Sequence, residues 1–341
     1  MINDVVKILR TVNSCTHVSA IDELNMNREI MGKWTINRAC IFIVLISLCA
    51  NTGHCLREEG DGKSDSPVPI VLWHGMGDSC CFSFSLGKIQ EILQNEIPGV
   101  YINSICIGDN VIEDVENSYF GNINEQIKHV CEQLSQDTRL QNGYNAIGFS
   151  QGAQFLRAVA QRCPDPPMLN LISLGGQHQG VFGIPKCSDT SRLCNYMRRM
   201  LRYGAYLWYI QESLVQAAYW HDPLKEDEYR KKNVFLVDIN NEKIINEVYR
   251  DNLQKLRTLV LVKFENDTMV EPTESEWFGF YKPGQAKEIQ KLQESELYLQ
   301  DWLGLRKMEE TGQIHFLSLP GDHLQFTATW FIENIIKKYL I

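Results

Sequence analysis

Short, largely apolar runs recur along the chain after residue 66, and longer stretches of mixed polarity separate them. Runs of about four to eight apolar residues are typical of strands buried on both faces of a sheet. Residues 122–134 instead place Ile123, Ile127 and Val130 on one side, as an amphipathic helix does. The alternation predicts a mostly parallel sheet with helices on both faces. The predicted strands are residues 70–73, 144–147, 169–174, 259–264 and 314–319.

An insertion is expected at about residues 177–257, before the strand at 259–264. Residues 234–237 form a further buried-strand candidate that ends at Asp238. Around residues 206–218, apolar side chains occupy both the stripe of a helix and its opposite side. A helix that is apolar all round is either packed in a core or lines an apolar pocket. The insertion is therefore predicted to be helical and lid-like.

The N-terminal part carries a different signal. Residues 39–50 are an apolar run preceded by Lys33 and Arg38, too short to span a bilayer but typical of a signal-peptide core. We interpret residues 1–53 as an extension plus signal peptide, with Met31 as an alternative start, and residues 54–66 as a polar linker. A buried strand or a membrane anchor is the alternative. Residues 67–341 have the size of one domain.

Charge and cysteine content narrow the classes of function. The net charge is −9 and basic clusters are absent, which argues against nucleic-acid binding. Eleven cysteines in a chain that enters the secretory pathway indicate disulfides. No cysteine or histidine spacing is typical of a zinc site. Cys106, between two isoleucines, is expected to be a free buried thiol.

Residues 148–152 read Gly-Phe-Ser-Gln-Gly and join a predicted strand to a predicted helix at residues 153–162. In such a turn the two glycines avoid collisions with the neighbouring strand and helix, and the serine hydroxyl is held clear of the sheet edge. Ser150 is therefore the candidate nucleophile.

A nucleophilic serine needs backbone N–H groups directed at the developing oxyanion. One is expected from Gln151, which follows the serine. The other is expected from the His-Gly loop after the first strand, where Met76 is the candidate.

The acid and the base should follow the serine in the chain, at the ends of later strands. His323, just after the last predicted strand, is the best-placed base, and His178 is the second candidate. Asp267 follows the strand at 259–264, and Asp238 competes with it. Asp322 is adjacent to His323 and cannot easily reach its ring N–H.

These motifs together resemble the palmitoyl-protein thioesterase family, in particular its lysosomal type 1 branch, over about residues 67–341. The resemblance implies an α/β-hydrolase fold and a triad of Ser150, Asp267 and His323. It favours Asp267 over Asp238, because the family's acid lies in a segment that matches Asn266-Asp267. It also implies three disulfides, Cys80–Cys81, Cys131–Cys163 and Cys187–Cys194, with a reactive dithiol as the alternative for Cys80 and Cys81. The similar segments are residues 74–81, 148–152, 175–181, 219–223 and 321–325.

The motifs predict a serine hydrolase, and the resemblance implies a thioesterase that removes long-chain acyl groups from S-palmitoylated proteins or peptides and from acyl-CoA. It needs no cofactor or metal, and we expect a monomer in the lysosome or outside the cell, without a membrane anchor after signal cleavage. A lipase or carboxylesterase and an inactive lipid- or protein-binding relative are the alternatives. Asn266 begins an Asn-Asp-Thr glycosylation sequon. Candidates for an acyl groove, with ordinary core packing as the alternative, are Leu207, Ile210, Leu214 and Trp220.

Overall fold

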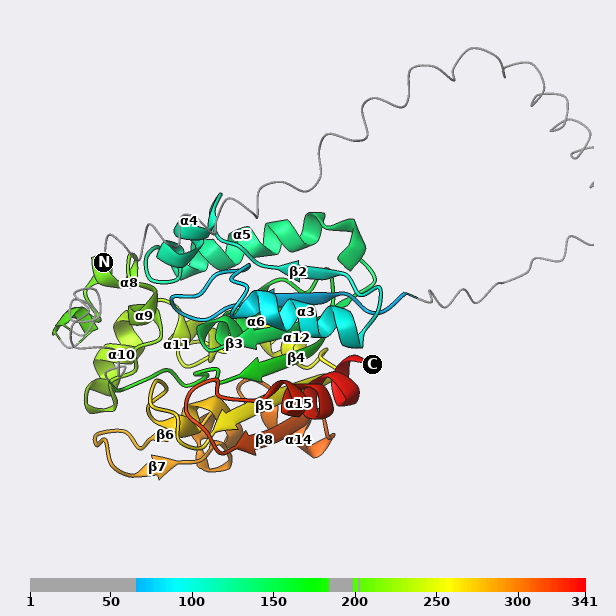
Figure 1. Ribbon diagram of the computed structural model, residues 1–341. Helices are drawn as coiled ribbons and strands as arrows, with labels where there is room; N and C mark the ends of the chain where they lie inside the picture. The colour runs from blue at the N-terminus through cyan, green and yellow to red at the C-terminus, as the bar shows by residue number, and fades with distance from the viewer. Residues whose placement is uncertain (1–65, 184–198, 202) are drawn as a thin grey trace, which may run out of the picture. The chain divides into compact units, whose positions relative to one another are not determined.

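The computed structural model describes residues 66–183, 199–201 and 203–341. The predicted signal peptide, residues 54–65 of the predicted linker, and the Cys187–Cys194 pair lie outside these residues. Six parallel strands form the main sheet, in the order β2-β1-β3-β4-β5-β8 (Figure 1). They are β1 (Ile70–Trp73), β2 (Ile102–Ser104), β3 (Tyr144–Phe149), β4 (Met168–Leu174), β5 (Thr258–Phe264) and β8 (Ile314–Leu319).

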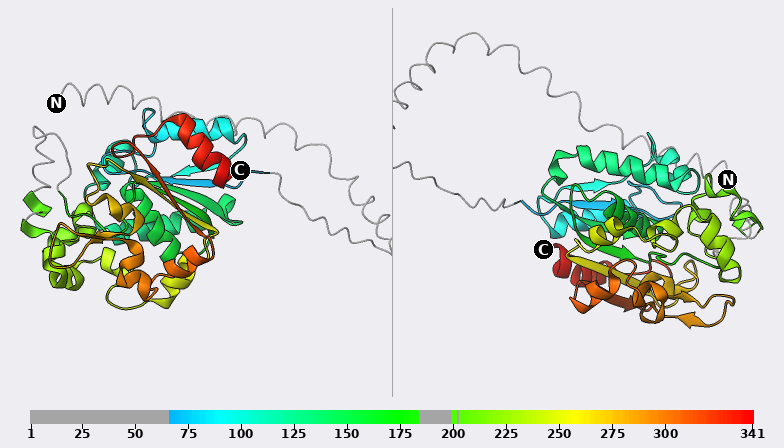
Figure 2. Two further views of the ribbon diagram at one scale, coloured as in Figure 1. Left: turned by 90° about the horizontal axis from the view of Figure 1, so that it is seen from below. Right: turned by 180° about the vertical axis from the view of Figure 1, so that it is seen from behind.

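Helices cover both faces of this sheet, as the apolar pattern predicts. Successive residues of a strand point to opposite faces. In β1, Val71 and Trp73 therefore pack with α5 (Ile123–Gln136) and α6 (Gln151–Arg162). Ile70 and Leu72 pack on the other side with α3 (Leu86–Glu96) and the C-terminal helices, α15 (Ala328–Phe331) and η5 (Ile332–Leu340) (Figure 2).

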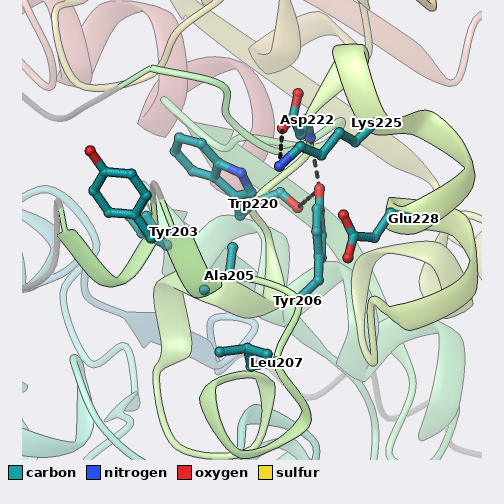
Figure 3. A pocket seen from close by; sticks show the side chains of 10 residues that line it. Tyr203, Ala205, Tyr206, Leu207, Trp220, Asp222, Lys225 and Glu228 are labelled. Atoms are coloured by element: carbon teal, nitrogen blue, oxygen red, sulfur yellow. Dashed lines mark hydrogen bonds and ion pairs between the residues drawn. The ribbon is translucent and has the colours of Figure 1, made fainter.

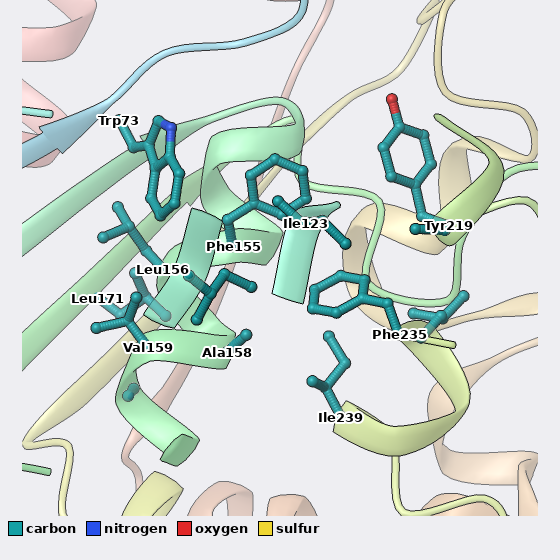
Figure 4. Close-up of a cluster of buried hydrophobic side chains, with 14 of the residues drawn as sticks. Trp73, Ile123, Phe155, Leu156, Ala158, Val159, Leu171, Tyr219, Phe235 and Ile239 are labelled. Atoms are coloured by element: carbon teal, nitrogen blue, oxygen red, sulfur yellow. The ribbon is translucent and has the colours of Figure 1, made fainter. Parts of the chain in front are cut away.

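Aromatic side chains join α6 to the segments between β4 and β5. The ring centroid of Phe155 lies 5.4 Å from that of Trp73 and 5.8 Å from that of Phe235, both in edge-to-face arrangements (Figure 4). All three side chains are buried. Burying rings of this size stabilises a fold by about 1.5–3 kcal/mol each. The helix that follows Ser150 is thus anchored on both sides.

The remaining elements are short. Among the described residues they are α4 (Val111–Asn117), η1 (Thr138–Leu140), α8 (Trp208–Gln211), α9 (Val215–Ala218), η2 (Pro223–Lys225), α10 (Glu226–Lys232), α11 (Leu236–Ile239), α12 (Glu247–Leu253), η3 (Thr273–Trp277), β6 (Phe280–Tyr281), β7 (Ile289–Gln290), η4 (Leu292–Glu294), α13 (Glu296–Leu299) and α14 (Leu305–Glu310). β6 and β7 pair antiparallel. No helix within residues 66–183, 199–201 and 203–341 combines the length and apolar character needed to cross a membrane.

The prediction of a buried strand at residues 234–237 is wrong. The segment enters α11, and the side-chain oxygen of Asn233 accepts hydrogen bonds from the N–H groups of Phe235 and Val237 at 3.0 and 3.3 Å. Val234 and Phe235 form a bend at these bonds, and Leu236 and Val237 are buried in the short helix that follows. A short apolar run is compatible with either element, so periodicity could not separate them.

The single apolar helix expected around residues 206–218 is divided into α8 and α9. Between them the chain docks on the segment after α4: Val215 N–H donates to the carbonyl of Tyr119, and Leu214 forms a β-bridge with Phe120. Ile210 and Leu214 belong to the core, whereas Trp208 is 76% exposed. The expectation that this segment is buried or pocket-lining all round therefore fails at Trp208.

Two disulfides occur in the described part of the chain. The predicted Cys131–Cys163 bridge ties α5 to the end of α6. The predicted Cys80–Cys81 bridge is wrong, and so is the free thiol at Cys106, because Cys80 is bonded to Cys106 across a Cα–Cα distance of 5.3 Å. Neighbouring residues have Cα atoms only about 3.8 Å apart, below the usual range for a disulfide. The parallel pairing of β1 with β2 brings Cys106 to a suitable distance instead.

Candidate active site

Ser150 lies in the turn between β3 and α6, with a positive φ of 55°. Its N–H donates to the carbonyl of Leu174 at the end of β4. The two glycines of the motif are required sterically: a Cβ on Gly148 would lie 2.2 Å from Ala153 Cα, and one on Gly152 would lie 2.4 Å from the carbonyl oxygen of Trp73. The sequence therefore forces a serine into a strained backbone conformation at the carboxyl edge of the sheet.

The loop after β1 packs directly on this serine. A Cβ on Gly75 would lie 3.0 Å from Ser150 Cβ and 3.7 Å from its Oγ. Met76, the candidate oxyanion donor, is the next residue in the loop. Gln151 is the first residue of α6, where backbone N–H groups have no partner within the helix and the helix dipole favours negative charge.

The side chain of Gln151 is buried and immobilised. Its Nε2 donates to the carbonyl of Ser118, and its Oε1 accepts from the hydroxyl of Tyr219, both at 2.9 Å. Gly77 donates its N–H to the hydroxyl of Ser118 at 2.8 Å. The segment around Ser118 therefore connects the loop after β1 with the start of α6. Sequence reasoning gave no indication of this connection.

A buried pair of charged groups supports the same loop. His74 Nε2 lies 3.1 Å from Asp114 Oδ1, and both side chains are at most 2% exposed. His74 Nδ1 lies 2.9 Å from the carbonyl oxygen of Gly75. Both ring nitrogens thus face acceptors, which indicates the imidazolium form. Burial alone would lower the pKa of His74, but the hydrogen bond to Asp114, its charge and the Gly75 carbonyl raise that pKa overall.

Asp114 gathers the surrounding donors. Besides His74 it accepts hydrogen bonds from Ser79 Oγ, Cys80 N–H and Ile107 N–H at 2.8–2.9 Å. Burial alone would raise the pKa of Asp114, but the hydrogen bond and charge of His74, with the backbone donors, lower it. The ligand atoms of Cys80, Cys106 and Asp114 lie within 4.8 Å of one another. The two sulfur atoms are bonded to each other, so this group offers no thiolate to a metal ion.

His323 and Asp267 meet at the ends of β8 and β5. The distance from His323 Nδ1 to Asp267 Oδ2 is 2.5 Å, and the Asp267 side chain is fully buried. Its other oxygen, Oδ1, accepts from the N–H groups of Met269 and Val270 at 2.7 and 2.8 Å. Burial alone would raise the pKa of Asp267, but the hydrogen bond to His323, its charge and the Val270 N–H lower it. The carboxylate therefore stays ionised and fixes one ring nitrogen of His323.

Asp322 holds the two loops together, although it cannot itself be the acid. Its Oδ1 accepts from the N–H groups of Thr268 and His323, both at 2.8 Å, and its Oδ2 accepts from the Thr268 hydroxyl at 3.1 Å. Asn266 N–H also donates to the carbonyl of Gly321. These bonds join the loop that carries Asp267 to the loop that carries His323, and so hold the two residues next to each other at the sheet edge.

The ring of His323 lies against the turn after β4. A Cβ on Gly175 would lie 3.1 Å from His323 Cε1. Leu174, the residue before Gly175, accepts a hydrogen bond from the N–H of Ser150. The turn after β4 therefore contacts both Ser150 and His323. The structure thus brings the three residues predicted as a triad to one edge of the sheet.

The competing candidates lie elsewhere. Asp238 is half exposed and forms an ion pair with Arg162 at 2.7 Å. His178 is fully buried, stacks on Phe278, and its Nε2 lies 2.8 Å from the hydroxyl of Ser173. Burial and the nearby charge of Arg157 lower the pKa of His178 well below its ordinary value. Among the described residues, neither Asp238 nor His178 forms a hydrogen bond with His323 or Asp267.

The acyl-groove candidates are divided between a pocket and the core. Leu207 and Trp220 line a small pocket, in which the Tyr206 hydroxyl accepts from Asp222 N–H at 2.8 Å (Figure 3). Asp222, Lys225 and Glu228 also line it, so its wall is partly charged. Ile210 and Leu214 are 2% and 3% exposed within the core. An acyl groove at these four residues stays a prediction.

The six-stranded parallel sheet and the serine turn after β3 define an α/β-hydrolase fold. The family model described as palmitoyl protein thioesterase matches residues 69–323, and the chain belongs to that family. Palmitoyl-protein thioesterase 1 of Caenorhabditis elegans is 52% identical over 274 residues, which cover 80% of this chain and 92% of the relative. The protein is therefore an enzyme of the thioesterase class.

Two further relatives extend the comparison. Palmitoyl-protein thioesterase 3 of Dictyostelium discoideum is 34% identical over 272 residues, 80% of this chain and 89% of the relative. A Xenopus laevis protein named lysosomal thioesterase PPT2-B is 26% identical over 286 residues, 82% of this chain and 94% of the relative.

Proposed function

We propose that this enzyme hydrolyses long-chain acyl thioesters, releasing palmitate and similar acids from cysteines of S-acylated proteins or peptides and from acyl-CoA. Ser150 is the nucleophile, His323 the general base and Asp267 the residue that orients the imidazole. The main support is the 2.5 Å contact between His323 Nδ1 and Asp267 Oδ2 beside the strained serine turn. The names of the relatives support the substrate class.

The chemistry follows from these positions. His323 takes the proton of Ser150 as Oγ attacks the thioester carbonyl carbon, and the negative charge develops on the carbonyl oxygen. The N–H groups of Met76 and Gln151 are proposed to stabilise that oxyanion. The C–S bond then breaks as His323 gives its proton to the sulfur, and the thiol leaves with the acyl group on Ser150. His323, neutral again, takes a proton from the water that attacks the acyl-enzyme, and it returns this proton to Ser150 Oγ as the fatty acid is released.

A side-by-side assay tests the substrate class. Purified enzyme would receive palmitoyl-peptide thioesters, palmitoyl-CoA and a triglyceride emulsion, with Ser150→Ala as the blank. We expect kcat/KM for thioesters to rise with chain length, since each added methylene contributes up to about 0.8 kcal/mol when buried. A preference for emulsified triglyceride would indicate a lipase, and indifference to chain length would contradict an acyl groove.

We also propose that the chain enters the secretory pathway and acts in the lysosome or outside the cell. The apolar run at residues 39–50, the disulfides and the name of the Xenopus relative support this location. Asn266 is exposed, and its sequon would be glycosylated on this route. Treatment of the secreted protein with a peptide N-glycosidase should increase its electrophoretic mobility, and Asn266→Gln should abolish that change. A mobility unchanged by the glycosidase would contradict glycosylation at Asn266.

A further inference from the structure

Glu276 lies in η3, a short helix that packs against β5, the strand that precedes the residue proposed as the acid. Its side chain has no exposure to solvent. Its Oε2 accepts a hydrogen bond from the N–H of Phe264, the last residue of β5, at 3.0 Å. Its Oε1 is buried and has no N–H or O–H donor among the described residues. An ionised carboxylate with a buried oxygen that accepts no hydrogen bond would lower the stability of the fold.

The remaining neighbour of Glu276 is itself a carboxyl group. The side chains of Glu276 and Asp267 are close enough to affect each other both as charges and through a hydrogen bond. Ionised carboxylates are acceptors only, so such a bond exists only when one of the two groups holds a proton. The unpartnered oxygen and the carboxyl-to-carboxyl contact therefore have one common explanation: a proton lies between these groups.

The donors around each group decide which one holds it. Asp267 accepts from His323, Met269 and Val270, and these three donors stabilise its charged form. Glu276 accepts only from Phe264 among the described donors. The proton therefore belongs to Glu276.

The charged groups near Glu276 agree with this assignment. Lys263, a cation that acts on Glu276 through its charge, has its Nζ 3.3 Å from Glu265 and 4.4 Å from the centroid of the Trp277 ring, so it is engaged elsewhere. Burial, followed by the charge of Asp267, raises the pKa of Glu276 to about 10. The ring of His323 is hydrogen-bonded to Asp267 Oδ2.

We propose that Glu276 is protonated in the folded enzyme and donates a hydrogen bond to Asp267, acting as a positioning residue for the acid. A neutral donor holds the Asp267 carboxylate in the orientation that His323 needs. An ionised Glu276 would instead place a second negative charge beside Asp267. The catalytic consequence rests on the proposed function, whereas the proton on Glu276 does not.

Stability as a function of pH tests the proton directly. The folded-state pKa is raised, so the folded state keeps a proton that the unfolded state releases above about pH 4.5. The contribution of Glu276 to stability is therefore complete below that pH and is lost as the pH rises toward about 10. Glu276→Gln supplies a neutral donor without this loss.

The stability of Glu276→Gln relative to wild type should therefore increase by up to tenfold in the folding equilibrium constant for each pH unit between about pH 5 and 8. Urea unfolding with disulfides intact measures it. Glu274→Gln, in the same turn, is the control for exchanging a glutamate there. A stability difference between Glu276→Gln and wild type that does not depend on pH, or a Glu276→Gln protein that does not fold, would overturn the assignment of the proton to Glu276.

Infrared spectroscopy and kinetics give independent readouts. Wild type at neutral pH should show the C=O stretch of a protonated carboxyl group, and Glu276→Gln should lose it; absence of this band in wild type would overturn the proposal. Glu276→Gln should keep kcat within a few fold, whereas Glu276→Leu, which removes the donor, should lower kcat about 10- to 100-fold with little change in KM. Equal kcat in Gln and Leu variants would overturn the positioning role. A fully active Asp267→Asn would contradict the proposed function while leaving the infrared assignment intact.

Discussion

The Nδ1 of His323 lies 2.5 Å from Oδ2 of Asp267, although 56 residues separate them in the chain. The contact forms because β5 and β8 are parallel neighbours whose carboxyl ends meet at one sheet edge. Asp267 lies three residues after Phe264, the last residue of β5, and His323 follows the turn at Gly321. The hydrogen bond fixes the proton on Nδ1 of the imidazole, and in the proposed mechanism the other nitrogen accepts the proton of Ser150.

The choice between the two acids gives the first prediction. Asp267→Asn should lower kcat by about 10⁴-fold, because an amide cannot hold the imidazole tautomer and stabilise its charged form. Asp238→Asn should leave kcat near the wild-type value, since Asp238 pairs with Arg162 at the surface. Steady-state hydrolysis of a palmitoyl thioester compares the two variants. A large loss in Asp238→Asn with an active Asp267→Asn would reverse the assignment.

The Cys80–Cys106 bridge gives the second prediction. Mass mapping of the unreduced protein should recover a peptide that joins Cys80 to Cys106, and another that joins Cys131 to Cys163. Cys106→Ser should lower the free energy of unfolding by about 3 kcal/mol, because the bridge closes a loop of 26 residues. Recovery of an intact link between neighbouring cysteines at positions 80 and 81 would contradict this connectivity.

The buried pair of His74 and Asp114 predicts a window of pH stability. The raised pKa of His74 means that its contribution is complete below about pH 6.5 and is lost as the pH rises through the folded-state value. The lowered pKa of Asp114 means that its contribution is complete above about pH 4 and is lost as the pH falls through its folded-state value. Stability from this pair should therefore be greatest between about pH 4 and pH 6.5, and should fall beyond these limits as the pH approaches either folded-state pKa.

Denaturant unfolding across pH checks this window. His74→Gln should weaken the loss of stability on the alkaline side, and Asp114→Asn should cost about 3 kcal/mol at pH 6 by leaving a buried charge without its partner. Lys88→Gln, at an exposed pair with Glu91, is the control and should cost under about 1 kcal/mol. Identical alkaline limbs for wild type and His74→Gln would show that the imidazole is neutral in the folded protein.

Much of the sheet could be predicted from the sequence, because strands buried on both faces leave continuous apolar runs. The predicted strand at 70–73 is fully buried and agrees with β1 residue for residue. The prediction at 314–319 also agrees with β8, although this edge strand is only partly buried. The serine turn was equally predictable, since Gly148 and Gly152 meet steric limits within a few residues of Ser150.

Contacts between distant segments were not predictable in the same way. Residues 234–237 are apolar enough for a strand, but hydrogen bonds from the N–H groups of Phe235 and Val237 to Asn233 form a bend, and a short helix begins at Leu236. The sequence places Cys106 between two isoleucines, which suggests burial but not the partner that β1–β2 pairing supplies. Glu276 lies in an acidic stretch that is typical of surface turns, and only the fold places it against Asp267.

The central claim is that Ser150 carries the acyl group during turnover. The most direct measurement is rapid acid quenching of the enzyme with a palmitoyl thioester, followed by peptide mass mapping. We expect a palmitoyl group on the peptide that contains Ser150, accumulating within one turnover and absent from Ser150→Ala. Turnover without any acylated Ser150 peptide would contradict the account. Acylation of a cysteine instead, in both wild type and Ser150→Ala, would contradict it as well.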